Sequence, residues 1–150
     1  MHKIEEIKPQ INKRIIKLLL TDKYWTRDQD MLRLIGNSIW IINTDSLNLI
    51  MNEILNEYSN IEEYFLNVQK RVASIYINYL HALYKYQNEN IASKYLKWLT
   101  KLSAVPELTL FKMLTLYYEA LFAKNNQKAK EIIKPLKMIV PKIIRYLPVK

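Results

Sequence analysis

Apolar residues recur at three- and four-residue intervals along almost the whole chain, while strict alternation of apolar and polar residues is scarce. The first spacing places side chains on one face of an α-helix, and the second is typical of a β-strand. The pattern therefore predicts an all-α fold of about seven helices. The longest helix is expected from about residue 61 to residue 86, and its length would be roughly 40 Å.

Prolines and possible capping residues divide the pattern into elements. Pro9 is expected to begin the first helix, because proline is tolerated in the first helical turn. Thr26 followed by Gln29 resembles a capping box, and Thr44 and Asp45 are expected to cap the helix that follows. Pro135 is expected to kink or shorten the last helix, because it removes a backbone hydrogen bond.

One part of the pattern recurs at an interval of 37 or 38 residues, from Ala82 to Leu99 and again from Ala120 to Leu136. In each copy an Ala-Leu-aromatic triplet precedes a polar turn, and an alanine then starts a new apolar face. This layout is typical of tetratricopeptide-like hairpins, which stack to bury one another's apolar faces. We expect one tetratricopeptide-like array of antiparallel helix hairpins, with an N-terminal helix in residues 1–24, repeat hairpins in 26–140 and a basic segment in 141–150.

The composition agrees with helices and excludes several classes of site. One glycine and five prolines are too few for a β-sandwich, and the absence of cysteine excludes disulfides and thiolate sites. No apolar run approaches the ~18 residues of a membrane span, and the first residues lack the layout of a signal peptide. These features predict a soluble protein of the cytoplasm that does not bind a membrane.

Candidate catalytic groups are few. His2 lies in the N-terminus, and His81 has neither an acid nor a second histidine three or four residues away. Gly36 is the only glycine, so a glycine-rich phosphate loop cannot form. The acidic pair Glu62-Glu63 suits a solvated helix start. We therefore expect a protein that is not an enzyme, with no catalytic residues, cofactor or metal.

The net charge of +9 is concentrated at the two ends of the chain. Residues 124–150 contain eight Lys or Arg and only one acid, Glu131, whereas residues 28–123 contain eight basic and ten acidic residues. A basic segment can attract nucleic acid through phosphate contacts. A composition rich in Lys, Ile, Asn and Tyr is also typical of AT-rich genomes, so nucleic-acid binding by this segment is the less favoured interpretation.

A polar stripe on the longest predicted helix is the main candidate site. Its members share one face because they follow spacings of 4, 3, 4, 3 and 4: Asn67, Arg71, Ser74, Asn78, His81 and Lys85. A surface helix shows such a face without any ligand. In a concave groove, however, the same amides could pair with a peptide backbone and the arginine with a carboxylate. The residues expected to bind a peptide, including two from a shorter stripe on the second helix, are Arg33, Asn37, Arg71, Asn78, Tyr79 and His81.

The order of residues after Trp25 resembles a known family. The W…E-L-x-L-F-x-N-x-L signature of the Rgg/GadR/MutR transcriptional regulators is similar to Trp25 followed by Met31-Leu32-Arg33-Leu34-Ile35-Gly36-Asn37-Ser38-Ile39. The runs from Tyr79 to Leu99 and from Leu116 to Leu136 also resemble the closing hairpins of the C-terminal helical repeat domain in that family. The resemblance covers about residues 20–140.

The match has both agreements and departures. The motif's Asn falls on Asn37 and its last Leu on Ile39. Its apolar pair falls on Leu34 and Ile35. The motif's Glu falls on Met31, with Asp30 as a neighbouring acid, and the Trp lies about two residues further from the Asn than in the pattern.

The resemblance implies a regulatory domain that dimerises and, in several members, binds a short signalling peptide in quorum sensing. Such regulators also carry a helix-turn-helix domain, for which the first 24 residues are too short, so direct DNA binding by this chain is not expected. The alternatives are a general protein–protein interaction scaffold and nucleic-acid binding through residues 124–150. The seam of a homodimer is expected to contain Ile139, Ile143, Ile144 and Leu147.

Overall fold

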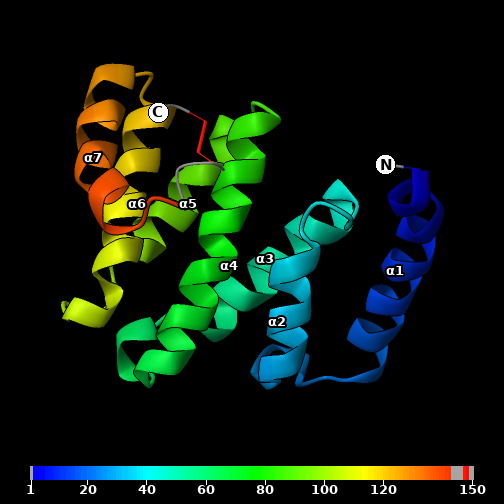
Figure 1. The fold of residues 1–150 in the computed structure, drawn as a ribbon. Coiled ribbons are helices and arrows are strands. Elements are labelled where there is room, and N and C mark those ends of the chain that lie inside the picture. Colours follow the sequence, from blue (N-terminus) through cyan, green and yellow to red (C-terminus); the bar gives the residue numbers. More distant parts are fainter. Residues whose placement is uncertain (1, 143–146, 149–150) are drawn as a thin grey trace. The chain divides into compact units, whose positions relative to one another are not determined.

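The computed structural model describes residues 2–142, 147 and 148 of the chain. These residues form seven α-helices and three short 3-10 helices and contain no strand (Figure 1). The prediction of an all-α fold with seven helices is therefore confirmed. The chain divides into two compact units, Met1–Asn60 and Ile61–Lys150, which are described separately below.

The first unit contains α1 (His2–Thr21), α2 (Gln29–Ser38) and α3 (Thr44–Glu57), with the 3-10 turn η1 (Trp25–Arg27) between α1 and α2. Its apolar positions follow helical spacing, so each helix buries one face. The most deeply buried side chains of this unit, all 3 % exposed or less, are Ile15, Trp25, Leu32, Ile35, Ile39, Ile50, Met51, Ile54 and Tyr58.

Three side-chain hydrogen bonds fix the loops of the first unit. The amide of Asn12 donates to the Ile41 carbonyl at 2.7 Å and accepts from the Asn43 backbone at 2.9 Å, which ties α1 to the loop before α3. The indole N–H of Trp25 donates to Oε2 of Glu53 at 2.8 Å, which ties η1 to α3. These bonds satisfy polar groups that would otherwise weaken packing.

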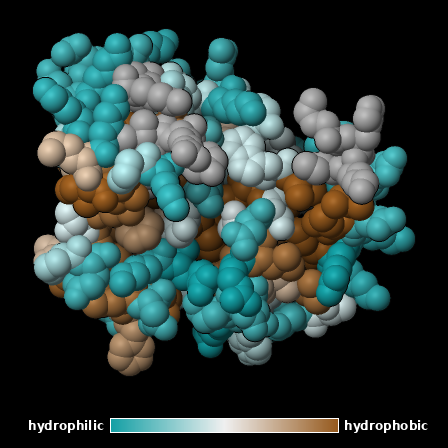
Figure 2. All heavy atoms as spheres, in the orientation of Figure 1, coloured by the Kyte–Doolittle hydropathy of each residue, from teal (hydrophilic) through white to brown (hydrophobic). Residues whose placement is uncertain are grey.

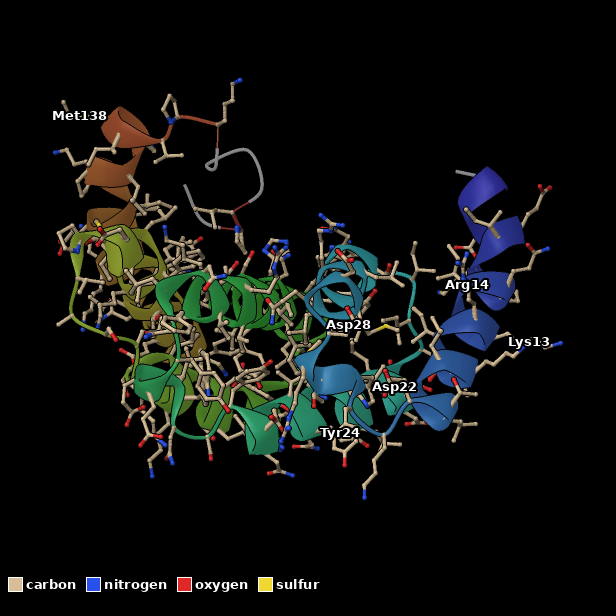
Figure 3. All side chains as sticks on the ribbon, turned by 90° about the horizontal axis from the view of Figure 1, so that it is seen from below. Lys13, Arg14, Asp22, Tyr24, Asp28 and Met138 are labelled. Atoms are coloured by element: carbon tan, nitrogen blue, oxygen red, sulfur yellow. The ribbon has the colours of Figure 1, made fainter. Side chains whose placement is uncertain are left out.

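The helix starts differ from the predicted ones by one or more residues. Asp28, at the start of α2 in Figure 3, caps this helix by accepting from the backbone N–H groups of Asp30 and Met31, at 2.9 and 3.2 Å. The predicted capping box at Thr26 is therefore wrong. The predicted cap at Thr44 and Asp45 is also wrong, because the Asn43 side chain takes that role.

Both prolines that were expected to limit a helix lie inside one. The first helix begins at His2 and not at Pro9, which is an interior residue of α1. Pro135 does not end α7, which continues to Ile139. Each proline removes only one donor, and the apolar face on either side of it can still pack.

The second unit contains α4 (Leu66–Lys85), α5 (Glu89–Leu99), α6 (Thr109–Phe122) and α7 (Asn126–Ile139). Helix α4 packs against both α5 and α6, α5 also packs against α6, and α6 packs against α7. The unit thus consists of two consecutive hairpins, α4–α5 and α6–α7, that lie against each other through α6 (Figure 1).

Helix α4 is shorter than the predicted span of residues 61–86. Ile61–Glu63 forms a separate 3-10 turn, η2, and α4 begins only after Phe65. Phe65 has extended backbone angles (φ −60°, ψ 152°), and its carbonyl accepts the first backbone bonds of the helix. Its side chain is 86 % exposed, so the apolar spacing that suggested a continuous helix does not reflect burial here.

The two hairpins have the same turn. Gln87 and Lys124 both adopt left-handed backbone angles, with φ of 56° and 58°. The residue after each of them donates its backbone N–H to the carbonyl five residues earlier, at 2.9 Å in both turns, as in a Schellman motif. Equivalent turn positions therefore lie 37 residues apart, so Leu83, and not Ala82, corresponds to Ala120.

Candidate functional site

The predicted polar stripe forms one face of α4. Two members of the stripe, Arg71 and His81, are half-buried. The others are exposed: Asn67, Ser74, Asn78 and Lys85. The opposite faces of α4 carry the core of the second unit, which includes Val72, Ile75, Tyr76, Tyr79, Leu80 and Leu83. Helical geometry therefore separates the polar stripe of α4 from its apolar packing groups.

His81 connects this face to α6. Its Nδ1 lies 2.9 Å from the hydroxyl oxygen of Tyr118, a residue that is only 1 % exposed, and the two rings meet edge to face at 89°. Burial lowers the pKa of His81 below 6.5, and the nearby Lys85 lowers it further, so the imidazole is neutral at pH 7. Burial also raises the pKa of the Tyr118 hydroxyl, which stays protonated. The Tyr118 hydroxyl can therefore donate to the neutral imidazole.

Tyr79 lies in the core and not on the polar face. Its side chain is 2 % exposed, and its ring meets that of Tyr95 of α5 edge to face at 5.1 Å. Burial raises the pKa of Tyr79 to about 12. The residue follows Asn78 in sequence, and one step along a helix turns the side chain by about 100°. The structure therefore places this predicted site residue among the packing groups.

Arg33 and Asn37 lie on α2, in the first unit, and both are exposed. The guanidinium of Arg33 pairs with Asp30 one turn earlier, at 2.9 Å. An exposed pair of this kind contributes little stability. The structure thus brings Arg71, Asn78 and His81 together on α4, while the two remaining candidates belong to another unit.

The predicted dimer seam falls on residues with different environments. Ile139, the last residue of α7, is 72 % exposed, and its neighbour Met138 at the end of this helix is 86 % exposed (Figure 3). Leu147 is buried within the chain, with 6 % exposure, so it does not offer its side chain to a partner. Ile143 and Ile144 lie outside the described residues.

The basic segment is an exposed, hydrophilic surface where it is described. The lysines of α7 all reach solvent: Lys128, Lys130, Lys134 and Lys137. In the view of Figure 2, hydrophilic side chains cover the upper part of the region where Figure 1 places α6 and α7. This surface could contact phosphates, as the sequence suggested.

Two further properties concern the described part of the chain only. None of its helices combines the length and apolar character needed to cross a membrane. Within the same residues, no three His, Asp or Glu side chains are grouped so that they could hold a metal ion.

No family model, curated protein or solved structure matches the chain. The resemblance to the Rgg regulators rests on the residues quoted above and stays a prediction. One residue of the site, Tyr118, was not predicted from the sequence. The 37-residue interval could have found it, because Tyr118 is the counterpart of His81 in the second hairpin.

Proposed function

We propose that the chain is a regulatory, partner-binding domain that binds a short peptide along the polar face of α4. The observation that carries this proposal is the continuous row of polar side chains on α4, each at least partly accessible to solvent. The amides of Asn67 and Asn78 can each donate to and accept from an extended peptide backbone. The guanidinium of Arg71 can form a charge-assisted bond with a carboxylate of the same peptide.

The hairpins of the second unit support the proposal. Helices α4 and α6 are the first helices of successive hairpins and pack against each other, as do α5 and α6. A tetratricopeptide-like array has this order of contacts and presents the first helices of its repeats to a ligand. Together with the resemblance to the Rgg regulators, this favours a domain that senses a peptide and controls transcription as a homodimer.

The test compares the wild-type chain with a double variant, Arg71→Ala with Asn78→Ala. Random octapeptides displayed on phage are selected on the wild-type chain, and one selected peptide is labelled for fluorescence anisotropy. We expect the double variant to bind that peptide about 30-fold more weakly or worse, because two direct hydrogen bonds to the ligand are lost. Helical circular dichroism should remain unchanged.

A matched control tests whether the loss of peptide binding is specific to residues of α4. The double variant Arg14→Ala with Asn60→Ala removes the same groups from exposed positions of the first unit (Arg14 is labelled in Figure 3). It should bind the peptide as tightly as the wild type. Equal affinity of both double variants contradicts the α4 site. If random duplex DNA binds instead, with an affinity that falls by orders of magnitude between low and high salt, nucleic acid is the partner.

A further inference from the structure

The turns of the two hairpins line a cavity of about 700 Å³ in the second unit that is partly open to solvent. Six of its seven lining residues, all except Lys85, come from equivalent positions of both turns, 37 residues apart. The pairs are Tyr84 with Leu121, Gln87 with Lys124, and Glu89 with Asn126. The cavity thus follows from the stacking of two like turns, and its volume is in the range of about 300–1,000 Å³ that small-molecule sites occupy.

The charges of the lining favour an anion. Lys85 and Lys124 line the cavity, against a single acid, Glu89. Glu89 lies in the first turn of α5, where a carboxylate also interacts with the N-terminal end of the helix dipole. In the part of the chain that the structure describes, the ammonium of Lys124 forms no ion pair. The side chains of Gln87 and Asn126 add amide donors to the same wall.

The remaining wall is apolar and aromatic. The ring of Tyr84 is half-buried and meets the ring of Phe122 edge to face at 5.8 Å, which holds it in place. Leu121, with 2 % exposure, forms the apolar surface at the equivalent position of α6. A ligand with both an anionic and an apolar part would contact both kinds of wall.

We propose that this cavity binds a small ligand through an oxyanion, a carboxylate or a phosphate, held by Lys85 and Lys124. The apolar part of the ligand contacts Tyr84 and Leu121. The inference does not depend on peptide binding along α4, because the cavity lies at the turns and would accept a free small molecule.

Titrations of the ¹⁵N-labelled chain, followed by NMR, test the proposal and separate the two sources of the oxyanion. The probes are N-acetylleucine, its neutral amide N-acetylleucinamide, and inorganic phosphate. We expect saturable shifts of the backbone amides in residues 84–89 and 121–126, with a dissociation constant on the order of 1 mM for a single oxyanion. Saturation by N-acetylleucine assigns a carboxylate ligand, and saturation by phosphate alone assigns a phosphate ligand. Equal binding of the neutral amide overturns the proposal.

Charge-neutralising variants locate the site. Lys124→Gln is compatible with the left-handed turn, because Gln87 already occupies the equivalent position with φ of 56°. Lys124→Gln and Lys85→Gln should each weaken binding of the best probe about threefold to tenfold, the range for one partly screened charge contact. Lys130→Gln removes the same charge from an exposed position of α7 outside the cavity and should leave affinity unchanged. Wild-type affinity in both Lys85→Gln and Lys124→Gln overturns the assignment.

Discussion

Hairpins α4–α5 and α6–α7 turn in the same way but fill their interiors differently. The first hairpin has an aromatic cluster in which Tyr76 contacts Tyr95 at 4.9 Å and Trp98 at 4.7 Å. All three side chains are 2 % exposed or less. Their counterparts in the second hairpin are Met113, Ile132 and Pro135, which are half-buried or exposed.

The faces of α4 and α6 that correspond to the polar stripe differ as well. Asn78 and Lys85 on α4 are exposed and polar, whereas their counterparts on α6 are Thr115, which is 3 % exposed, and the half-buried Phe122. The two hairpins share the turn and the buried alanine that follows it, which is Ala92 in the first hairpin and Ala129 in the second. The comparison teaches that the turn and a close helix contact define the hairpin, while the other positions can be adapted to packing or to binding.

The largest effect is expected from the aromatic cluster of the first hairpin. Trp98→Ala should lower the free energy of unfolding by about 3–5 kcal/mol, because it leaves a large cavity beside Tyr76. Urea unfolding followed by circular dichroism at 222 nm measures this loss. Lys97→Ala, at the exposed neighbouring position, should change the free energy by less than about 0.5 kcal/mol. A loss in Trp98→Ala no larger than that of Lys97→Ala would show that the cluster does not stabilise the hairpin.

An intermediate effect of opposite sign is expected at the two turns. Glycine relieves the left-handed strain but gains entropy in the unfolded chain, so Gln87→Gly and Lys124→Gly should each raise the free energy of unfolding by about 0.5–1 kcal/mol. Because the two φ angles differ by only 2°, the gains should be equal within error. In the same urea experiment Lys130→Gly, inside α7, should instead cost about 1 kcal/mol. Unequal gains in the free energy of unfolding would show that the two turns are not equivalent.

The helices and the repeat could be predicted from the sequence because the apolar period is strong and the hairpins share a layout. The caps could be predicted only approximately. Asp28 and Asn43 each have another good capping residue within two positions, and the choice between them depends on where the chain turns. The continuation of α7 past Pro135 was missed because packing on both sides of a proline outweighs the local penalty.

The candidate site was predictable in part. The spacing of polar residues on α4 was enough to place Arg71, Asn78 and His81 on one face. The contact of His81 with Tyr118 and the cavity at the turns arise from the stacking of one hairpin on the other, which helical periodicity does not describe. Tyr79 shows the converse error, because an aromatic residue beside a polar stripe is more often a packing group.

The smallest effect is expected from the pH dependence of the contact between the hairpins. The pKa of His81 in the folded chain lies below its ordinary value of 6.5. The unfolded chain therefore binds more protons as the pH falls through 6.5, so the free energy of unfolding should fall with it. Lys85 on α4 and Tyr118 on α6 face the imidazole, and the phenol stays neutral over pH 5.5–8 because burial raises its pKa.

Urea unfolding at several pH values between 5.5 and 8 measures this dependence. His81→Gln should flatten the loss of stability below pH 6.5, since glutamine does not titrate and can still accept from the Tyr118 hydroxyl. The change should be smaller than that of the turn variants, because His81 is half-buried and solvent screens its charge. The matched control is His2→Gln, which replaces the second histidine of the chain in the same way. If the free energy of unfolding of His81→Gln depends on pH as that of the wild type does, the neutral imidazole of His81 does not contribute to the contact between α4 and α6.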